Sequence, residues 1–176
     1  PSYSSPDADV VLLSCDGIPF RAHASVLKMA SGFFEKMFEM PRDPNEGNDE
    51  PLPMAESSDV ILALLEFIYP NGGFPKIDSF DLLSRLLTAA EQYEIPRITT
   101  YLRVYVMVDP KFRDDSLDLY VIARRYGWEE EGKIASQGTL KLNLTSPKFA
   151  DVLKKLDSES LLKLQRLHHL RRRAVL

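Results

Sequence analysis

The chain has 176 residues, of which 44% are hydrophobic and 27% are charged. This composition is typical of one globular domain, or of one domain with a helical extension, and it excludes a wholly disordered chain. The net charge of -4 and the isoelectric point of about 5.4 argue against a body built to bind nucleic acid. The single cysteine excludes an intrachain disulfide and favours a reducing, intracellular compartment, the cytoplasm or the nucleus. The sequence has no apolar run of membrane-spanning length and no cleavable signal pattern.

A short hairpin is expected near the N-terminus. Residues 10–14 form an apolar run of strand length, Asp16-Gly17 follows, and residues 18–22 form a second run. An Asp-Gly pair between two such runs favours a tight turn, because glycine adopts the positive φ that the turn requires. Pro19 has no N–H to donate, so the second strand is expected at an edge of the sheet.

Helical periodicity follows the hairpin. Seven apolar residues recur at a spacing that places them on one helical face. They are Val26, Leu27, Ala30, Phe33, Phe34, Met37 and Phe38. Ser31-Gly32 interrupts this face, so two short helices with a joint are expected rather than one rod.

An acidic stretch over residues 42–59 separates these helices from the next one. Its six acidic residues face one arginine, which is typical of a solvated loop. Leu52-Pro53-Met54 within it can form a short strand. Ser57 or Ser58 is a suitable N-cap for a helix with an apolar stripe from Val60 to Ile68.

The rest of the chain has a helical pattern. One helix is expected from near Asp78 to Pro96, and another from Arg97 to Val108. Later helices are expected after Ser116 or Asp115, from Glu130 to Leu144, and after a cap at Ser158. Ile134 and Leu140 are expected on the buried side of the helix from Glu130 to Leu144. Gly132 and Gly138 lower the helix propensity of that segment. A few strands with clustered helices indicate an α+β fold rather than an alternating doubly wound sheet.

No motif brings together the side chains that catalysis or metal binding requires. One cysteine and three histidines, two of them adjacent, do not supply a zinc site. There is neither a G-x-S-x-G elbow nor a glycine-rich phosphate loop. Cys15 precedes an acid rather than a base, so it is expected to be a small buried residue and not an activated thiol. We therefore expect no enzymatic activity, no metal or other cofactor, and no small-molecule substrate.

The segment from Arg166 to Arg173 is strongly basic. It could contact nucleic acid, or its cations could simply stabilise the C-terminus of a helix. The helix-end interpretation is preferred, because the segment lacks the interleaved aromatic residues of nucleic-acid binders. The two adjacent histidines, His168 and His169, are expected to be solvated.

Four segments, in the right order, resemble a BTB/POZ domain over residues 8–105. They are Asp9 to Leu12 with the Asp16-Gly17 turn and Phe20 to Leu27, then Ala30 to Phe38, Val60 to Tyr69, and Leu86 to Tyr93. Leu119 to Trp128 resembles the helical BACK segment of many BTB proteins, and the whole is similar to short fungal BTB proteins. The resemblance implies a small sheet of about three strands flanked by helices over residues 1–105, and an all-helical extension over residues 106–176. It also implies structural roles for His23 and Asp9.

The resemblance further implies a protein-interaction module. In family members that recruit a cullin ubiquitin-ligase scaffold, a hydrophobic residue and a glutamate near the end of the second helix pair contribute, and Met37-Phe38-Glu39 loosely resembles that pattern. The expected partner-binding residues are Met37, Phe38, Glu39, Met40, Tyr69 and Phe74. The first hypothesis is an adapter or scaffold that links a partner to a cullin ligase. The alternatives are a self-associating transcription cofactor and, third, a nucleic-acid binder that uses the basic tail.

Overall fold

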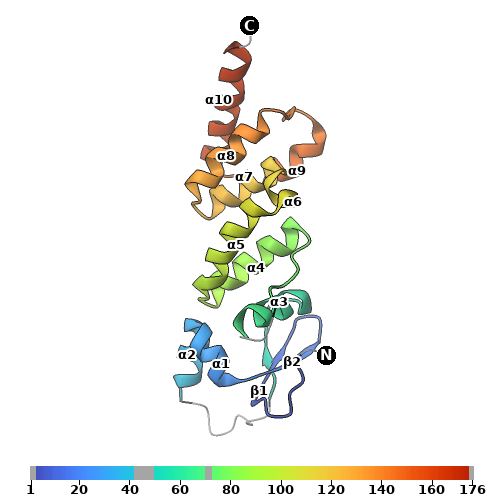
Figure 1. The fold of residues 1–176 in the computed structure, drawn as a ribbon, viewed down its shortest axis with the longest axis vertical. Coiled ribbons are helices and arrows are strands. Elements are labelled where there is room, and N and C mark those ends of the chain that lie inside the picture. The colour runs from blue at the N-terminus through green and yellow to red at the C-terminus, as the bar shows by residue number, and fades with distance from the viewer. Residues whose placement is uncertain (1–2, 42–49, 70–72, 175–176) are drawn as a thin grey trace. The chain divides into compact units, whose positions relative to one another are not determined.

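In the computed structural model, the described residues are 3–41, 50–69 and 73–174. They hold three strands, ten α-helices and one 3-10 helix. The chain divides into two units, Pro1–Leu102 and Arg103–Leu176. The order of the elements confirms the predicted α+β class, with a small sheet among helices followed by an all-helical region (Figure 1).

The sheet is formed by β1 (Val10–Leu13), β2 (Pro19–Ala22) and β3 (Leu52–Pro53) in the order β2-β1-β3. β1 pairs with β2 in the antiparallel direction and with β3 in the parallel direction. Gly17 has a φ of 80° in the hairpin turn, as the Asp-Gly pair predicted. The strand order confirms that Pro19 lies in an edge strand, and the short strand expected around residue 52 is present.

The joint at Ser31-Gly32 is also confirmed. It separates α1 (Ala24–Ala30) from α2 (Gly32–Glu39). The expectation of one shared apolar face is wrong, since only Leu27 on α1 and Phe34 on α2 are buried. The backbone of Ser31 is extended, so the angular register of the second helix does not continue that of the first.

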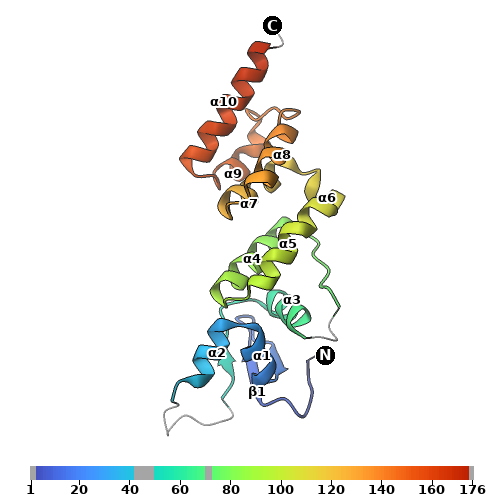
Figure 2. The same cartoon turned by 60° about the vertical axis from the view of Figure 1, so that its left-hand side comes forward.

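Three longer helices follow: α3 (Ser58–Ile68), α4 (Phe80–Gln92) and α5 (Pro96–Val108). α3 and α4 belong to the first unit, and the division between the units falls within α5, after Leu102. α3 carries six buried residues and lies between the sheet and α4 in both views (Figures 1 and 2). Asp16 of the hairpin turn accepts hydrogen bonds from the Ser58 backbone N–H at 2.8 Å and from its hydroxyl at 2.6 Å. This carboxylate satisfies a free N–H at the start of α3 and thereby ties the helix to the sheet.

The second unit contains α6 (Pro110–Arg113), α7 (Ser116–Arg125), α8 (Glu129–Thr139), the 3-10 helix η1 (Pro147–Phe149), α9 (Ala150–Leu153) and α10 (Ser158–Ala174). Six of the ten residues of α7 are buried, and α7 packs along α8. α10 joins this core through the buried Leu164 and Ser160, whose carbonyl accepts a hydrogen bond from Tyr120 at 3.0 Å.

Several local expectations are wrong for physical reasons. Cys15 is exposed, because it lies in the hairpin turn and not on the packed face of β1. α8 ends at Thr139 rather than at residue 144, and Ile134 is 52% exposed. The carboxylate that caps α10 belongs to Asp157, which accepts from the Ser160 N–H at 2.8 Å.

Two further outcomes concern polar segments. His168 is half-buried rather than solvated, and its Nε2 lies 3.0 Å from the Thr139 hydroxyl. Residues 42–49 of the acidic stretch lie outside the described residues.

Among the helices that the structure describes, none is long and apolar enough to cross a membrane.

Candidate functional site

α2 is fastened to the turn between α4 and α5 by polar bonds. The Ser31 hydroxyl accepts from the Phe34 N–H at 3.1 Å and donates to the Tyr93 carbonyl at 2.5 Å. One buried hydroxyl therefore caps the start of α2 and satisfies a carbonyl at the end of α4. Lys36 reinforces the contact, because its ammonium lies 2.8 and 2.9 Å from the two carboxylate oxygens of Glu94.

Tyr93 is the aromatic centre of this contact. Its ring stacks on Phe34 with centroids 5.5 Å apart and meets the edge of Phe33 at 5.3 Å. Its hydroxyl donates a hydrogen bond to the Glu56 carboxylate. Burial, assisted by that hydrogen bond, raises the pKa of the Tyr93 hydroxyl far above its ordinary value, so the group remains protonated. The inner face of α2 is thus held rigidly.

The outer face of α2 leaves apolar side chains accessible. We call Phe33, Met37, Phe38, Glu39 and Met40 the α2 surface. Met40 is 65% exposed and Phe33 is 37% exposed. Met37 and Phe38 are half-buried, and Phe38 stacks on Phe34 with centroids 6.0 Å apart. These contacts orient the apolar groups that face solvent.

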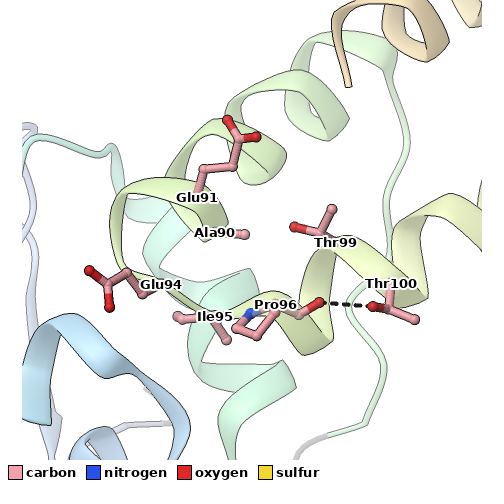
Figure 3. Close-up of a pocket in the computed structure, with 7 residues that line it drawn as sticks. All are labelled: Ala90, Glu91, Glu94, Ile95, Pro96, Thr99 and Thr100. Carbon is pink, nitrogen blue, oxygen red and sulfur yellow. Dashed lines mark hydrogen bonds between the residues drawn. The ribbon is translucent and has the colours of Figure 1, made fainter. Parts of the chain in front are cut away.

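A pocket of about 550 Å³ lies where α4 ends and α5 begins (Figure 3). It is lined by Ala90, Glu91, Glu94, Ile95, Pro96, Thr99 and Thr100. The view shows the Ala90 methyl group and the Thr99 side chain facing each other across it, with Glu94 at one edge. The pocket therefore combines apolar and hydroxyl-bearing walls with carboxylates at the rim.

The backbone at Glu94 shapes this pocket. Glu94 has a φ of 51°, a left-handed conformation that non-glycine residues rarely adopt. The Glu94 N–H bonds to the Glu91 carbonyl at 3.1 Å, and the Ile95 N–H bonds to the Ala90 carbonyl at 2.8 Å. These two bonds form the Schellman ending of α4 and turn the chain sharply into α5. Glycine is usual at this position, whereas Glu94 provides the carboxylate that holds Lys36.

The six residues predicted to bind a partner lie in three local environments. Met37, Phe38, Glu39 and Met40 belong to the α2 surface. The Tyr69 hydroxyl instead accepts from the His23 backbone N–H at 2.8 Å and lies 2.9 Å from His23 Nδ1. Phe74 is 69% exposed and stacks on Tyr101 with centroids 4.6 Å apart. No hydrogen bond, ion pair or ring contact among the described residues joins Tyr69 or Phe74 to the α2 surface.

The two residues expected to have structural roles make internal hydrogen bonds. The Asp9 carboxylate accepts from the Ala24 N–H at 2.8 Å and so satisfies the start of α1. His23 contacts the Tyr69 hydroxyl through both its backbone N–H and its Nδ1. No group of three potential metal ligands occurs among the residues that the structure describes.

The first unit combines a small three-stranded sheet with helices, and it leaves apolar side chains of α2 and of its C-cap exposed. The family model for the BTB/POZ domain matches residues 4–107, which is more than half of the chain, and the chain belongs to this family. BTB/POZ domains are generally interaction modules rather than enzymes.

A curated relative supports the same assignment. The chain is 34% identical over 90 residues to Zinc finger protein chinmo of Drosophila melanogaster. The match covers 51% of this chain but only 14% of the fly protein. Similarity to short fungal BTB proteins and to a BACK segment stays a prediction.

Sequence reasoning missed the pocket. Its signal was the Tyr-Glu-Ile-Pro run at residues 93–96, in which the proline ends one helical pattern and starts the next. That run predicted a break between helices. It did not predict a hollow, because the shape depends on the left-handed Glu94 and on the angle at which α5 leaves the turn.

Proposed function

We propose that this chain is an adapter whose α2 surface and adjoining pocket bind a helical scaffold of the cullin ubiquitin-ligase type. The observation that carries the proposal is the exposed apolar side chain of Met40, the C-cap residue of a helix that is anchored to the pocket turn. Apolar groups on a rigid element are the usual centre of a protein interface, since their burial costs little conformational entropy. The pattern Met37-Phe38-Glu39 supports the choice of a cullin over other scaffolds.

Charge further defines the partner. Glu39 and Glu91 are exposed and have no ion-pair partner among the described residues. A partner that presents lysine or arginine around an apolar centre would match this surface, and the match would raise the association rate more than the affinity. In this proposal Met37, Phe38, Glu39 and Met40 form the main contact, with Tyr69 and Phe74 in secondary contacts.

The test measures binding of the purified chain to the N-terminal domain of a cullin by calorimetry. Met40→Asp places a charge in the proposed interface without touching the core, and we expect it to weaken binding at least about tenfold, equivalent to about 1.4 kcal/mol. Ile134→Asp is the matched control, because Ile134 is similarly exposed but lies on α8. Equal affinities for the two variants, or no binding by the parent chain, would reject the cullin assignment.

Self-association as a transcription cofactor is the second candidate. It is favoured by the exposed Phe74, which stacks on the half-buried Tyr101 in the first unit, and by the zinc-finger relative. Light scattering of the purified chain distinguishes the candidates: a dimer that Phe74→Asp dissociates supports self-association, and a monomer counts against it. Either candidate places the protein in the cytoplasm or the nucleus.

A further inference from the structure

Charge is distributed unevenly along this acidic chain. Residues 133–176 contain ten lysines and arginines but only three acidic residues. Residues 1–102 contain seven basic and sixteen acidic residues. Although the whole chain has a net charge of -4, residues 133–176, which we call the C-terminal segment, have a net charge of +7.

The three acidic residues of the C-terminal segment are already engaged. Asp151 pairs with Lys154 at 2.9 Å, and Glu159 pairs with Lys163 at 2.5 Å. The Asp157 carboxylate accepts hydrogen bonds from the Ser160 N–H and hydroxyl, both at 2.8 Å. The arginines of α10 are exposed and have no hydrogen-bond or ion-pair partner among the described residues. They are Arg166, Arg171, Arg172 and Arg173.

Helix geometry spreads these guanidinium groups around the end of α10. At about 100° per residue, Arg166 and Arg173 project roughly opposite to the buried Leu164. Arg171 and Arg172 project from other sides of the last turns, yet both are exposed. Arg166 and Arg173 are separated by about 10 Å along the helix axis, given the rise of 1.5 Å per residue.

We propose that α10 binds duplex DNA by lying in the major groove, with its arginines on the phosphates of both strands. This groove is about 12 Å wide, admits one α-helix and presents phosphate rows on two sides. A flat acidic protein surface would reach the arginines on one side of the helix only. Arginine also suits phosphate, because its planar fork of N–H donors binds two oxygens at once.

An anionic membrane fits the helix less well. The exposed large apolar residues of α10 among those described are Leu162 and Leu170, and the segment from 158 to 174 has no aromatic residue. Membrane-surface helices generally bury a continuous apolar face, often with tryptophan or phenylalanine. The proposal is independent of the adapter function, since it uses no residue of the α2 surface.

The test measures binding of a fluorescein-labelled 20-base-pair DNA duplex to the full chain by anisotropy at several salt concentrations. Four phosphate contacts predict a slope of log K against log[salt] of about -3.6, so raising NaCl from 50 to 200 mM should weaken binding about 150-fold. Arg166→Gln/Arg173→Gln should reduce the slope by about 1.8. The control Lys76→Gln/Arg97→Gln removes two exposed cations from the first unit and should leave the slope unchanged.

The outcomes separate DNA from other anions. Glutamine retains helix propensity at these exposed positions, and circular dichroism verifies that each variant is folded. The proposal is overturned by absence of binding at tens of micromolar protein in 50 mM NaCl, or by an equal slope change in the control. It is also overturned if poly-L-glutamate or phosphatidylserine vesicles compete as well as unlabelled duplex at equal charge. Displacement by duplex alone supports it.

Discussion

Two glycines of α8 should respond in opposite directions to the same substitution. The sequence treats Gly132 and Gly138 alike, as residues that weaken a helix. In the structure, a Cβ atom at Gly132 would lie 3.7 Å from the Ala123 Cβ, an ordinary van der Waals distance. A Cβ atom at Gly138 would lie 2.1 Å from the Ser116 Oγ and 2.8 Å from the Ser116 Cβ, where α7 crosses close to α8.

The magnitudes follow from these distances. Gly132→Ala should raise the free energy of unfolding by about 1 kcal/mol, because alanine restricts the unfolded chain and its Cβ makes only ordinary van der Waals contacts in the fold. Gly138→Ala should lower it by about 1 to 3 kcal/mol, because the Ser116 Oγ can rotate away but its Cβ can move only with the backbone. The helix-propensity gain offsets part of this loss.

The assay is urea unfolding followed by the fluorescence of Trp128, the single tryptophan, which is buried at the N-cap of α8. A double-mutant cycle then checks the cause: adding Ser116→Gly should recover most of the stability lost by Gly138→Ala, although it costs stability alone. The close-approach argument is refuted if the two alanine variants change stability in the same direction, or if Ser116→Gly gives no recovery.

Three further predictions concern the first unit. Ser31→Ala should lower the free energy of unfolding by about 2 to 3 kcal/mol, because it removes a helix cap and leaves the Tyr93 carbonyl without that donor. Ser79→Ala removes only a helix cap and should lower it by about 1 kcal/mol in the same denaturation assay. Equal losses would contradict the bridging role of Ser31. The hydrogen bond from Arg85 holds the pKa of Asp59 well below its ordinary value of 3.8, so the unfolded state binds a proton first and stability falls as the pH drops below about 4. Asp59→Asn should reduce this loss of stability at low pH, measured as the free energy of unfolding against pH, by less than about 1 kcal/mol, because the Arg85–Asp59 pair is half-exposed. An unchanged pH dependence would argue against a stabilising role for this ion pair. Tyr69→Phe should lower the free energy of unfolding by about 1 kcal/mol, because the His23 backbone N–H loses its acceptor. Calorimetry should show a smaller loss of cullin affinity for Tyr69→Phe than for Met40→Asp, because Tyr69 makes only a secondary contact in the proposed interface, and a larger loss would contradict that assignment.

Local patterns predicted the elements of this fold well. The Asp16-Gly17 turn, the joint at Ser31-Gly32 and the short strand at Leu52 each depend on the backbone preferences of a few adjacent residues, which tertiary contacts did not override. Errors arose where a pattern had to predict burial. Ile134 has helical spacing but projects to solvent, and Cys15 is apolar but lies in a turn.

The sequence by itself therefore determined the order and type of the elements and, through its spaced motifs, the BTB/POZ family. The tertiary structure decided which side chains reach a partner. Phe34 of α2 is buried because Tyr93, nearly sixty residues later, stacks on it, whereas Met40 at the C-cap of the same helix remains exposed. Periodicity records the direction of a side chain relative to its own helix, whereas exposure depends on what distant segments place against it.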